Sequence, residues 1–248
     1  MNSLAIIIQC YNEAKRFQLE RFTKFIQNHP SVVLFFVDDG SNDDTPSLLK
    51  GLRSDFGERV QIFTLLKNKG KAEAVRTGMT EAIKNIKIER FAFLDADLAT
   101  SLEECYEIAA RISDTKAFVF GSRIKKLDNN IQRKRYRFVL GRIIATFIST
   151  MLRLPIYDSQ CGCKIFRRDW AASVFIHPFL STWLFDVEIF YRLIHQFGRK
   201  KICEEIEEVP LKAWIDTEDS KVSLLYGIKV WFDLIKIYRH FKLYHGLF

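Results

Sequence analysis

The sequence predicts an α/β fold: a mostly parallel sheet with helices on both faces, followed by a helical C-terminal extension. First, continuous apolar runs of strand length alternate with segments of helical spacing through the first half of the chain, a pattern typical of parallel sheets buried on both faces. Second, every one of these apolar runs ends in polar residues. Third, the alternation stops in the second half, where long amphipathic stretches dominate.

Five runs rich in β-branched and aromatic residues predict the strands of this sheet. They are 4–10, 32–39, 60–66, 91–97 and 117–123. Segments with helical spacing separate them, at 14–28, 45–56, 71–85 and 101–113. Local signals support two of these helices: Pro46 follows Thr45 at one start, and Ser101 with Glu104 has the spacing of a capping box.

The second half predicts mainly helices. Residues 133–154 form a basic amphipathic stretch, 158–166 a turn that enters a short strand, and 183–198 a helix with Gly198 near its C-cap. Residues 203–215 alternate loosely and predict a strand, and 222–243 return to helical spacing. Because no repeat or linker occurs, we expect a single domain, 1–248, with halves 1–124 and 125–248.

The composition is that of a soluble globular protein with a basic surplus. The chain of 248 residues is 48% hydrophobic and 27% charged, and its formal net charge is +8. This charge favours an anionic partner: a nucleotide, a phospholipid surface or nucleic acid. The five cysteines include no CxxC pair, which argues against structural zinc. Their odd number, without a signal peptide, favours a reducing cytosol, and the lack of an 18-residue uncharged apolar run predicts no membrane span.

Two aspartates, Asp95 and Asp97, end the apolar run of the segment FAFLDADLAT. Residues two apart on a strand point to one face. Two carboxylates held together suit a hard divalent cation that also binds phosphate oxygens. Such a cation, Mg²⁺ or Mn²⁺, can neutralise a diphosphate leaving group. The position after the fourth strand of an α/β pattern therefore favours a metal site over a plain turn.

Two further strand ends carry candidate nucleotide contacts. In VDDGSNDDT the acidic residues follow an apolar run and can accept hydrogen bonds from a base or ribose, although these residue types also favour turns. NKGKAEAV is a glycine turn before a helix, where Lys71 is a candidate nucleotide contact and a solvated loop is the alternative. Neither segment matches a P-loop, and no GxGxxG occurs, so a dinucleotide cofactor is not expected.

These motifs together carry a resemblance. CYNE, VDDGSNDDT, NKGKAEAV, DADLAT and GSR stand in the order seen in family 2 inverting glycosyltransferases of the GT-A fold, a Rossmann-like fold. The second-half segments DSQCGCKIF, WLFDVEIFYRL, EVPLKAW and DSKVS resemble the polyprenol-phosphate glycosyltransferases, and most of all the dolichyl-phosphate β-glucosyltransferases. The resemblance covers roughly residues 4 to 235. It makes the first half the nucleotide-sugar-binding half and the second the acceptor and membrane-proximal half.

The resemblance also implies site residues. The nucleotide-sugar contacts it implies, together with Lys71, are Gln9, Tyr11, Glu13, Val37, Asp39, Asp95, Ala96, Asp97, Leu98, Arg123 and Lys221. Gln9 replaces the family's usual proline, Asp97 is the firmest metal ligand, and Arg123 and Lys221 match basic residues near the phosphates. Arg137 aligns with an arginine that meets the acceptor phosphate, and Gly141 falls where the family often has a serine.

The implied reaction is transfer of a sugar from a nucleotide diphosphate sugar to a polyprenyl monophosphate. We expect UDP-glucose as donor, with GDP-mannose as the alternative. The acceptor phosphate is already an anionic nucleophile near neutral pH, so a general base is not required. Asp158 and Glu188 are candidates for positioning the acceptor; their alternatives are a turn residue and a solvated helix position. Nucleic acid is not expected as a partner.

The acceptor implied by the resemblance is a lipid, so we expect the protein to act peripherally at the cytoplasmic face of a membrane. Two stretches alternate basic with apolar or aromatic residues at helical spacing, as interfacial helices do: 133–154 and 221–248. The alternative is that their apolar faces pack against the sheet.

The sequence argues against three other functions. DADLAT partly matches the DxDxT of haloacid-type phosphatases, but Ala99 stands where threonine is required and the motif follows the fourth strand. A sugar-1-phosphate nucleotidyltransferase has a related fold, but the chain has no glycine-rich, basic N-terminal loop. A non-catalytic membrane or nucleic-acid binding module predicts loss of Asp95 or Asp97, and both are present.

Overall fold

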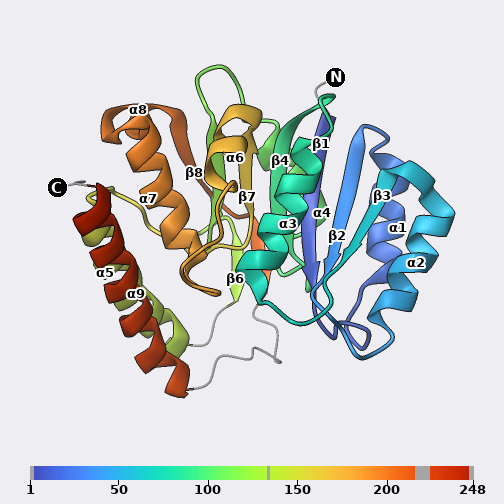
Figure 1. Ribbon diagram of the computed structural model, residues 1–248, viewed down its shortest axis with the longest axis horizontal. Helices are drawn as coiled ribbons and strands as arrows, with labels where there is room; N and C mark the ends of the chain where they lie inside the picture. Colours follow the sequence, from blue (N-terminus) through green and yellow to red (C-terminus); the bar gives the residue numbers. More distant parts are fainter. Residues whose placement is uncertain (1–2, 133–134, 216–223, 246–248) are drawn as a thin grey trace.

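A seven-stranded sheet forms the centre of the molecule (Figure 1). The computed structural model describes residues 3–132, 135–215 and 224–245. The strand order is β3-β2-β1-β4-β7-β5-β8, and within it only β7 runs antiparallel to its neighbours. The strands are β1 (Ser3–Cys10), β2 (Val32–Asp38), β3 (Val60–Thr64), β4 (Ile88–Asp95), β5 (Phe118–Ser122), β7 (Lys164–Arg167) and β8 (Ile206–Pro210). The predicted α/β fold with a mostly parallel sheet is confirmed.

Helices cover both faces of the sheet, because each strand alternates its buried side chains between two cores. In β1, Ala5 and Ile7 face one core, while Leu4, Ile6 and Ile8 face the other. The first core is closed by α3 (Lys71–Ile83), α6 (Arg168–Val174) and α7 (Phe185–Phe197). The second is closed by α1 (Leu19–Asn28), α2 (Thr45–Phe56) and α4 (Leu102–Ala109).

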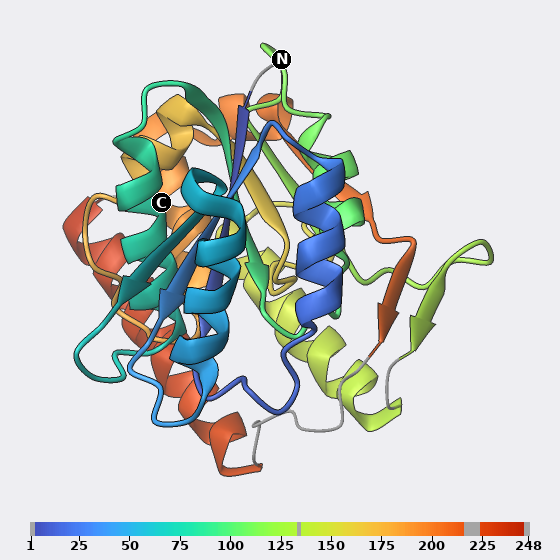
Figure 2. The same cartoon turned by 90° about the vertical axis from the view of Figure 1, so that its right-hand side faces the viewer.

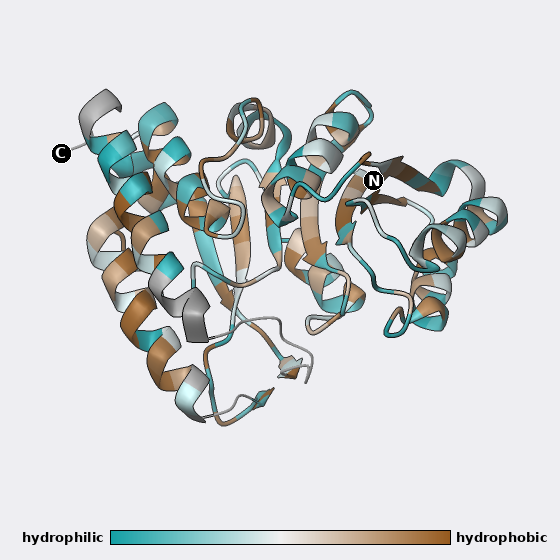
Figure 3. Ribbon diagram, turned by 60° about the horizontal axis from the view of Figure 1, so that its bottom comes forward, coloured by the Kyte–Doolittle hydropathy of each residue, from teal (hydrophilic) through white to brown (hydrophobic). Residues whose placement is uncertain are grey.

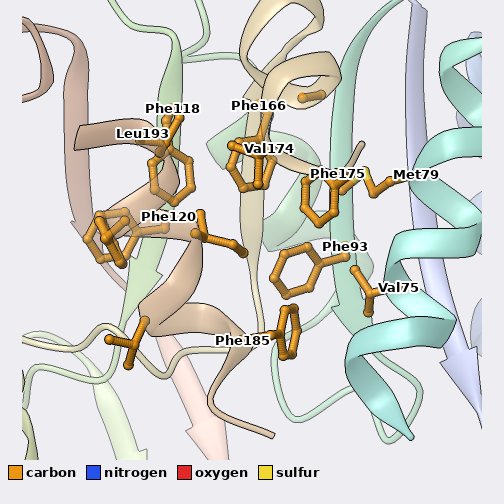
Figure 4. Packing of buried hydrophobic residues seen from close by; sticks show 14 of the residues in the cluster. Val75, Met79, Phe93, Phe118, Phe120, Phe166, Val174, Phe175, Phe185 and Leu193 are labelled. Atoms are coloured by element: carbon orange, nitrogen blue, oxygen red, sulfur yellow. The ribbon is translucent and has the colours of Figure 1, made fainter. Parts of the chain in front are cut away.

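Phenylalanines fill the first core where β4, β7 and β5 lie side by side (Figure 4). The rings of Phe118 and Phe166 stack with centroids 4.4 Å apart, and Phe93 meets Phe185 of α7 at 5.6 Å. Aromatic pairs at these separations add stability beyond their buried area. Much of the high phenylalanine content of the chain is therefore core, and it anchors α7 over the ends of β4 and β5.

The N-terminal helices differ from prediction in their bounds. Helix α1 begins at Leu19 and not at 14, because residues 11–18 form turns after β1. Pro46 stands in the first turn of α2 as predicted. Ser101 Oγ accepts a hydrogen bond from Glu104 N, 3.0 Å away, which confirms half of the capping box. The other half is wrong, since the Glu104 carboxylate accepts a hydrogen bond from the backbone N–H of Lys212 instead.

The second half contains elements that its sequence pattern did not reveal. The predicted strand 203–215 is wrong as one element: its first residues end α8 (Arg199–Glu205), the next form β8, and the last form β9 (Ala213–Ile215). Strand β9 pairs with β6 (Asn130–Gln132) in a separate two-stranded sheet. Figure 2 shows this small sheet apart from the main one, beside the N-terminal end of α5 (Arg135–Leu152).

Two long helices, α5 and α9 (Leu224–His245), lie side by side at one flank of the molecule (Figure 1). The rings of Phe147 and Trp231 join them, with centroids 5.0 Å apart. Each helix buries one stripe of side chains against the core: Ile148, Met151 and Leu152 on α5, and Val230, Leu234, Ile237 and Phe241 on α9. Among the helices that the structure describes, none is both long and apolar enough to cross a membrane.

Candidate active site

Polar residues gather at the carboxyl edge of the sheet, because six of its seven strands run in the same direction. The register places Gln9 beside Val37 on one neighbour and beside Asp95 on the other. Arg123 directly follows β5 at the same edge. The turn of the chain into α3, at Gly70, completes this edge. Residues predicted from five separate segments are therefore brought together, as ligand sites of open α/β sheets require.

Asp95 is held by three neighbours. Its Oδ1 accepts a hydrogen bond from Gln9 Nε2 at 2.8 Å and lies 2.6 Å from Lys71 Nζ. On the other side, Gly162 packs so closely that a Cβ at that position would overlap Asp95 Oδ2. Burial would raise the pKa of Asp95, but the Lys71 charge and the hydrogen bonds outweigh burial, so its pKa lies below its ordinary value. Asp95 is therefore a fixed, ionised carboxylate.

Asp97 lies in the turn that follows β4 and differs electrostatically from Asp95. Its Oδ1 accepts a hydrogen bond from Ala99 N at 3.0 Å, and its carbonyl accepts one from Gln18 Nε2 at 2.8 Å. Leu98 takes a φ of 52°, a left-handed conformation unusual for leucine. Burial and the negative charge of Asp95 raise the pKa of Asp97 above its ordinary value. Two neighbouring carboxylates that oppose each other's ionisation are stabilised together by a cation.

The donor chemistry of this pair fits a hard divalent cation, which prefers carboxylate oxygens. Across the described residues, no group of three or more His, Cys, Asp or Glu side chains is arranged to hold a metal. Of those residues, Asp95 and Asp97 are the candidates, and Asp95 Oδ1 is already shared by Gln9 and Lys71. Asp97 is thus the better candidate ligand, and diphosphate oxygens and water would complete the shell.

Asp39 organises the loop before α3. It is only 3% exposed, and its carboxylate accepts hydrogen bonds from the backbone N–H groups of Lys69 (2.7 Å) and Gly70 (2.8 Å). Gly70 has a φ of 89°, a conformation that glycine adopts readily. Burial raises the pKa of Asp39, although both hydrogen bonds oppose that shift. Asp39 therefore joins the VDDGSNDDT and NKGKAEAV segments, and in this structure its carboxylate binds the protein's own backbone.

The residues matched to nucleoside contacts are placed differently from one another. Glu13 is buried and paired with Arg16, while its backbone N–H donates to Thr45 Oγ1 at 2.8 Å. Tyr11 is half-buried at the edge. The side chain of Val37 is fully buried in the core, because it points away from the edge between β2 and α3. Contact of Val37 with a base therefore stays a prediction, and it would have to come from the Val37 backbone.

Arg123 is fixed by Asp158. Its Nε and Nη2 lie 2.7 and 2.8 Å from the two carboxylate oxygens, and its backbone N–H donates to the same carboxylate at 3.0 Å. The guanidinium lies 5.2 Å from the ring centroid of Trp214. Burial by itself would lower the pKa of Arg123. The negative charge of Asp158 outweighs burial, and the charge of Asp95 acts in the same direction as Asp158, so the pKa of Arg123 is raised. Asp158 is thus neither a plain turn residue nor an unpaired acid; it orients Arg123.

Glu188 lies inside the protein and not on a solvated face of its helix. It is fully buried in α7, and its carboxylate accepts hydrogen bonds from the backbone N–H groups of Leu180 (2.9 Å) and Ser181 (2.8 Å). Burial raises its pKa above the ordinary value. The solvated helix position is therefore wrong, and a role in positioning the acceptor stays a prediction. Glu188 shapes the loop whose Thr182 carbonyl accepts a hydrogen bond from Ala72 N of α3.

Sequence reasoning missed a buried ion pair behind the edge. Lys164 is fully buried, its Nζ lies 2.6 Å from Asp186 Oδ1 of α7, and it donates to the carbonyl of Cys161. The negative charge of Asp186 also helps raise the pKa of Lys71. The only signal in the sequence was a lysine inside the apolar segment CGCKIF. Gly162 was missed as well, because a close approach to Asp95 cannot be read from a lone glycine.

A cavity of about 660 Å³ lies next to Arg123. It is formed by the segment between β5 and β6, by β6 itself and by the first turns of α5. Its lining combines cationic, amide and apolar side chains: Arg123, Lys125, Asn129, Asn130, Ile131, Gln132, Phe138 and Val139. Such a lining suits a ligand with an anionic head and an apolar body.

For three residues matched to the phosphates or the acceptor, the structure gives little about their contacts. Lys221 lies outside the described residues. Arg137 belongs to α5, but its side chain lies outside the described part. Gly141 lies in the same helix. Ala96 and Leu98 are buried, so any contact they make with a diphosphate would come from their backbone.

A mostly parallel sheet with carboxylates, a lysine and an arginine at its carboxyl edge is the architecture expected of a GT-A transferase. The chain belongs to glycosyl transferase family 2, whose model matches residues 5–175. It is therefore a glycosyltransferase, and this family match sets aside the phosphatase, nucleotidyltransferase and non-catalytic alternatives.

Relatives and solved structures agree with this assignment. The chain is similar to the dolichyl-phosphate beta-glucosyltransferase of Homo sapiens, with 29% identity over 88% of this chain and 69% of the relative. It is 32% identical to the dolichyl-phosphate beta-glucosyltransferase of Saccharomyces cerevisiae, over 94% of this chain and 73% of the relative. The fold resembles mannosyl-3-phosphoglycerate synthase from Rubrobacter xylanophilus, with a TM-score of 0.72, 13% identity, and coverage of 100% and 76%. The fold also resembles glucosyl-3-phosphoglycerate synthase from Mycobacterium tuberculosis in complex with Mn²⁺, UDP-glucose and phosphoglyceric acid. The TM-score is 0.64 at 13% identity, over 96% of this chain and 80% of that chain. At this identity the structures show the fold alone.

Proposed function

We propose that this protein transfers glucose from UDP-glucose to a polyprenyl or dolichyl monophosphate, with inversion at the sugar and with a divalent cation. The observation that carries this proposal is the position of Arg123. It lies between the carboxylate edge, where the charge of Asp95 acts on it, and the cavity with mixed cationic and apolar lining. One arginine thus borders both a candidate diphosphate site and a candidate site for a lipid phosphate. The names of the relatives support the glucose and dolichyl phosphate in this proposal.

In this proposal the chain supplies charge and orientation. Asp97 and Asp95 would hold Mg²⁺ or Mn²⁺, which when bound would offset the negative charge of the departing UDP. Lys71 and Arg123 place fixed positive charges at the same edge, since both are held by carboxylates. The acceptor phosphate is itself an oxygen nucleophile, and its attack opposite the UDP leaving group gives inversion. No protein group has to remove a proton.

The flank formed by α5 and α9 supports a lipid acceptor. Large apolar side chains are exposed on both helices, and Figure 3 shows the hydrophobic stretches along them. They are Tyr136, Phe138, Val139, Leu140, Ile143 and Phe147 on α5, and Trp231, Phe232 and Ile235 on α9. Phe138 and Val139 also line the cavity beside Arg123. A peripheral position on the cytoplasmic membrane face would bring the lipid phosphate to this cavity while its chain stays in the bilayer.

The test is a transfer assay with radiolabelled UDP-glucose and GDP-mannose, each with a short polyprenyl monophosphate and with Mg²⁺, Mn²⁺ or EDTA. We expect transfer from UDP-glucose, loss of transfer in EDTA, and a weaker reaction with GDP-mannose. Calorimetry of UDP and GDP binding separates donor recognition from turnover. Tighter GDP binding with transfer of mannose would overturn the choice of donor. Donor hydrolysis without a lipid product would overturn the choice of acceptor.

A further inference from the structure

The turn that carries Asp158 is clamped by a residue of β8. Glu208 accepts hydrogen bonds from two successive backbone N–H groups, that of Tyr157 through Oε2 at 2.8 Å and that of Asp158 through Oε1 at 2.7 Å. One carboxylate thus fixes the peptide plane from which the Asp158 side chain leaves. Hydrogen bonds to a charged acceptor are about twice as strong as neutral ones. Glu208 lies in the EVPLKAW segment, to which the proposed mechanism assigns no role.

A second residue holds the same turn from the opposite side. Arg142 of α5 donates from Nη1 to the carbonyl of Tyr157 at 2.7 Å, and its guanidinium lies 3.6 Å from the centroid of the Tyr157 ring. The backbone of Tyr157 is therefore bound at its N–H by Glu208 and at its carbonyl by Arg142. Arg142 connects the turn to α5, the helix that also exposes large apolar side chains at the flank.

What this turn holds is Arg123. The Asp158 carboxylate takes two contacts from the guanidinium and one from the Arg123 backbone, and 14% of the arginine side chain is exposed. A planar guanidinium in a bidentate pair has its direction set by the carboxylate. If the peptide of Asp158 rotates, the guanidinium must rotate with it or lose the pair.

We propose that Glu208 is a positioning residue, which acts together with Arg142 through the Tyr157–Asp158 turn to aim Arg123 at the phosphates. The inference rests on the proposed function, because it takes Arg123 to be the residue that meets a phosphate. Glu208 itself contacts only the backbone of the turn among the interactions described above, and it acts at a distance from the reacting atoms. Strand β8, helix α5 and the Tyr157–Asp158 turn together set the direction of the Arg123 guanidinium.

The experiment is a double-mutant cycle between Glu208→Gln and Arg123→Ala, with UDP affinity measured by calorimetry and turnover measured separately. Glutamine keeps the shape of Glu208, but it can accept only one of the two N–H groups and turns an N–H₂ toward the other. Glu207→Gln is the matched control, since this neighbour on β8 pairs with Arg111 and not with the turn. Arg142→Lys, which can still donate to the Tyr157 carbonyl, is the conservative partner of Arg142→Ala.

We expect Glu208→Gln to weaken UDP binding or lower kcat by about 10-fold, and Glu207→Gln to change neither by more than about 2-fold. Arg142→Ala should reduce the same quantity, UDP binding or kcat, by a similar factor to Glu208→Gln, and Arg142→Lys should recover most of this loss. In the Arg123→Ala background, Glu208→Gln should have almost no further effect. An equal loss in both backgrounds would overturn the proposal, because Glu208 would then act without Arg123. A loss that follows the melting temperature in every variant would also overturn it, as a purely structural role.

The UDP measurement keeps this inference separate from the proposed function. If the wild type binds UDP and shows the coupling but transfers nothing to polyprenyl phosphate, the acceptor is wrong and the positioning role stands. If the wild type transfers glucose to the lipid and the cycle is additive, the positioning role is wrong and the proposed function stands.

Discussion

The carboxyl edge of the sheet and the α5–α9 flank differ in how far their side chains are bound by the rest of the protein. At the edge, carboxylates are bound by the protein itself: Asp95 by Lys71, Asp39 by backbone N–H groups, and Asp158 by Arg123. At the flank, apolar side chains such as Val139 and Phe232 are left in contact with solvent, 55% and 68% exposed. The edge is held by contacts within the protein itself, whereas the flank has its apolar side chains uncovered.

This difference separates what each region contributes to catalysis. Preorganised charges stabilise a transition state because they need not be reoriented when the reaction occurs. Exposed apolar area gains free energy only when another apolar surface covers it, at about 25 cal/mol per Å². The edge should therefore determine turnover, and the flank should determine how the protein meets its acceptor. The following predictions test that separation.

The largest effect is expected at the edge from Asp97→Ala. Loss of this carboxylate should lower turnover by roughly 10²–10³-fold, as removal of one transition-state contact does. The melting temperature should stay near that of the wild type, because removing Asp97 also removes its repulsion with Asp95. Transfer assays and thermal melts with and without Mn²⁺ check both points.

The control for Asp97→Ala is Asp55→Ala, which removes an exposed aspartate on α2, away from the edge. Asp55→Ala should leave turnover and the Mn²⁺-dependent melting shift unchanged. A variant Asp97→Ala that keeps near-normal turnover in EDTA would contradict the metal role of the edge.

A smaller effect is expected from Gly162→Ala, which sharpens the contrast by disturbing Asp95 without removing it. The new methyl group would overlap the Asp95 carboxylate and force it or the loop to move. Overpacking of this kind costs about 1–3 kcal/mol in the free energy of unfolding. We expect a lower melting temperature together with weaker UDP binding in the presence of Mn²⁺.

Gly51→Ala provides the comparison, because a Cβ at that exposed position in α2 meets no other atom within 4 Å. It should raise stability slightly, since alanine is favoured over glycine in helices. If Gly162→Ala melted like the wild type and bound UDP normally, the close contact with Asp95 would be irrelevant to the site.

The smallest effect on the enzyme itself is expected at the flank. The double variant Leu140→Asp, Ile143→Asp places two charges on one exposed stripe of α5, outside the lining of the cavity. The affinity for anionic vesicles at low salt, measured by co-sedimentation, should fall by roughly 10²-fold, because each of the two apolar side chains withdrawn from lipid loses about 1.5 kcal/mol or more. UDP affinity should not change, since neither residue belongs to the carboxylate edge.

Ile86→Asp is the matched control for the flank. Ile86 is 85% exposed, but it lies in the turn before β4, at the opposite edge of the sheet. This control should sediment with vesicles as the wild type does. Equal sedimentation of all three proteins would mean that the exposed side chains of α5 do not meet lipid.

The sequence by itself determined the elements whose signals are local. Strands β1 to β5 appeared as apolar runs, because a strand buried on both faces must be apolar throughout. Pro46 and Ser101 marked helix starts, because the groups that satisfy a helix end lie within a few residues of it. Asp95 and Asp97 were found because a charge at the end of a buried strand is conspicuous in a linear reading. The placement of Asp95 beside Gln9, in contrast, came from the strand order, which sets β4 next to β1.

The tertiary structure decided which side chains meet across the fold. Asp158 and Arg123 are 35 residues apart, and they pair because β7 inserts antiparallel between β4 and β5. Glu188 resembled a surface helix residue, yet α7 packs into the core and buries it against the loop at Leu180. The strand predicted at 203–215 was divided among α8, β8 and β9, because weak local preferences yield to the sheet neighbours available. Contacts of this kind depend on the order of strands in the sheet, and no local pattern of residues specifies that order.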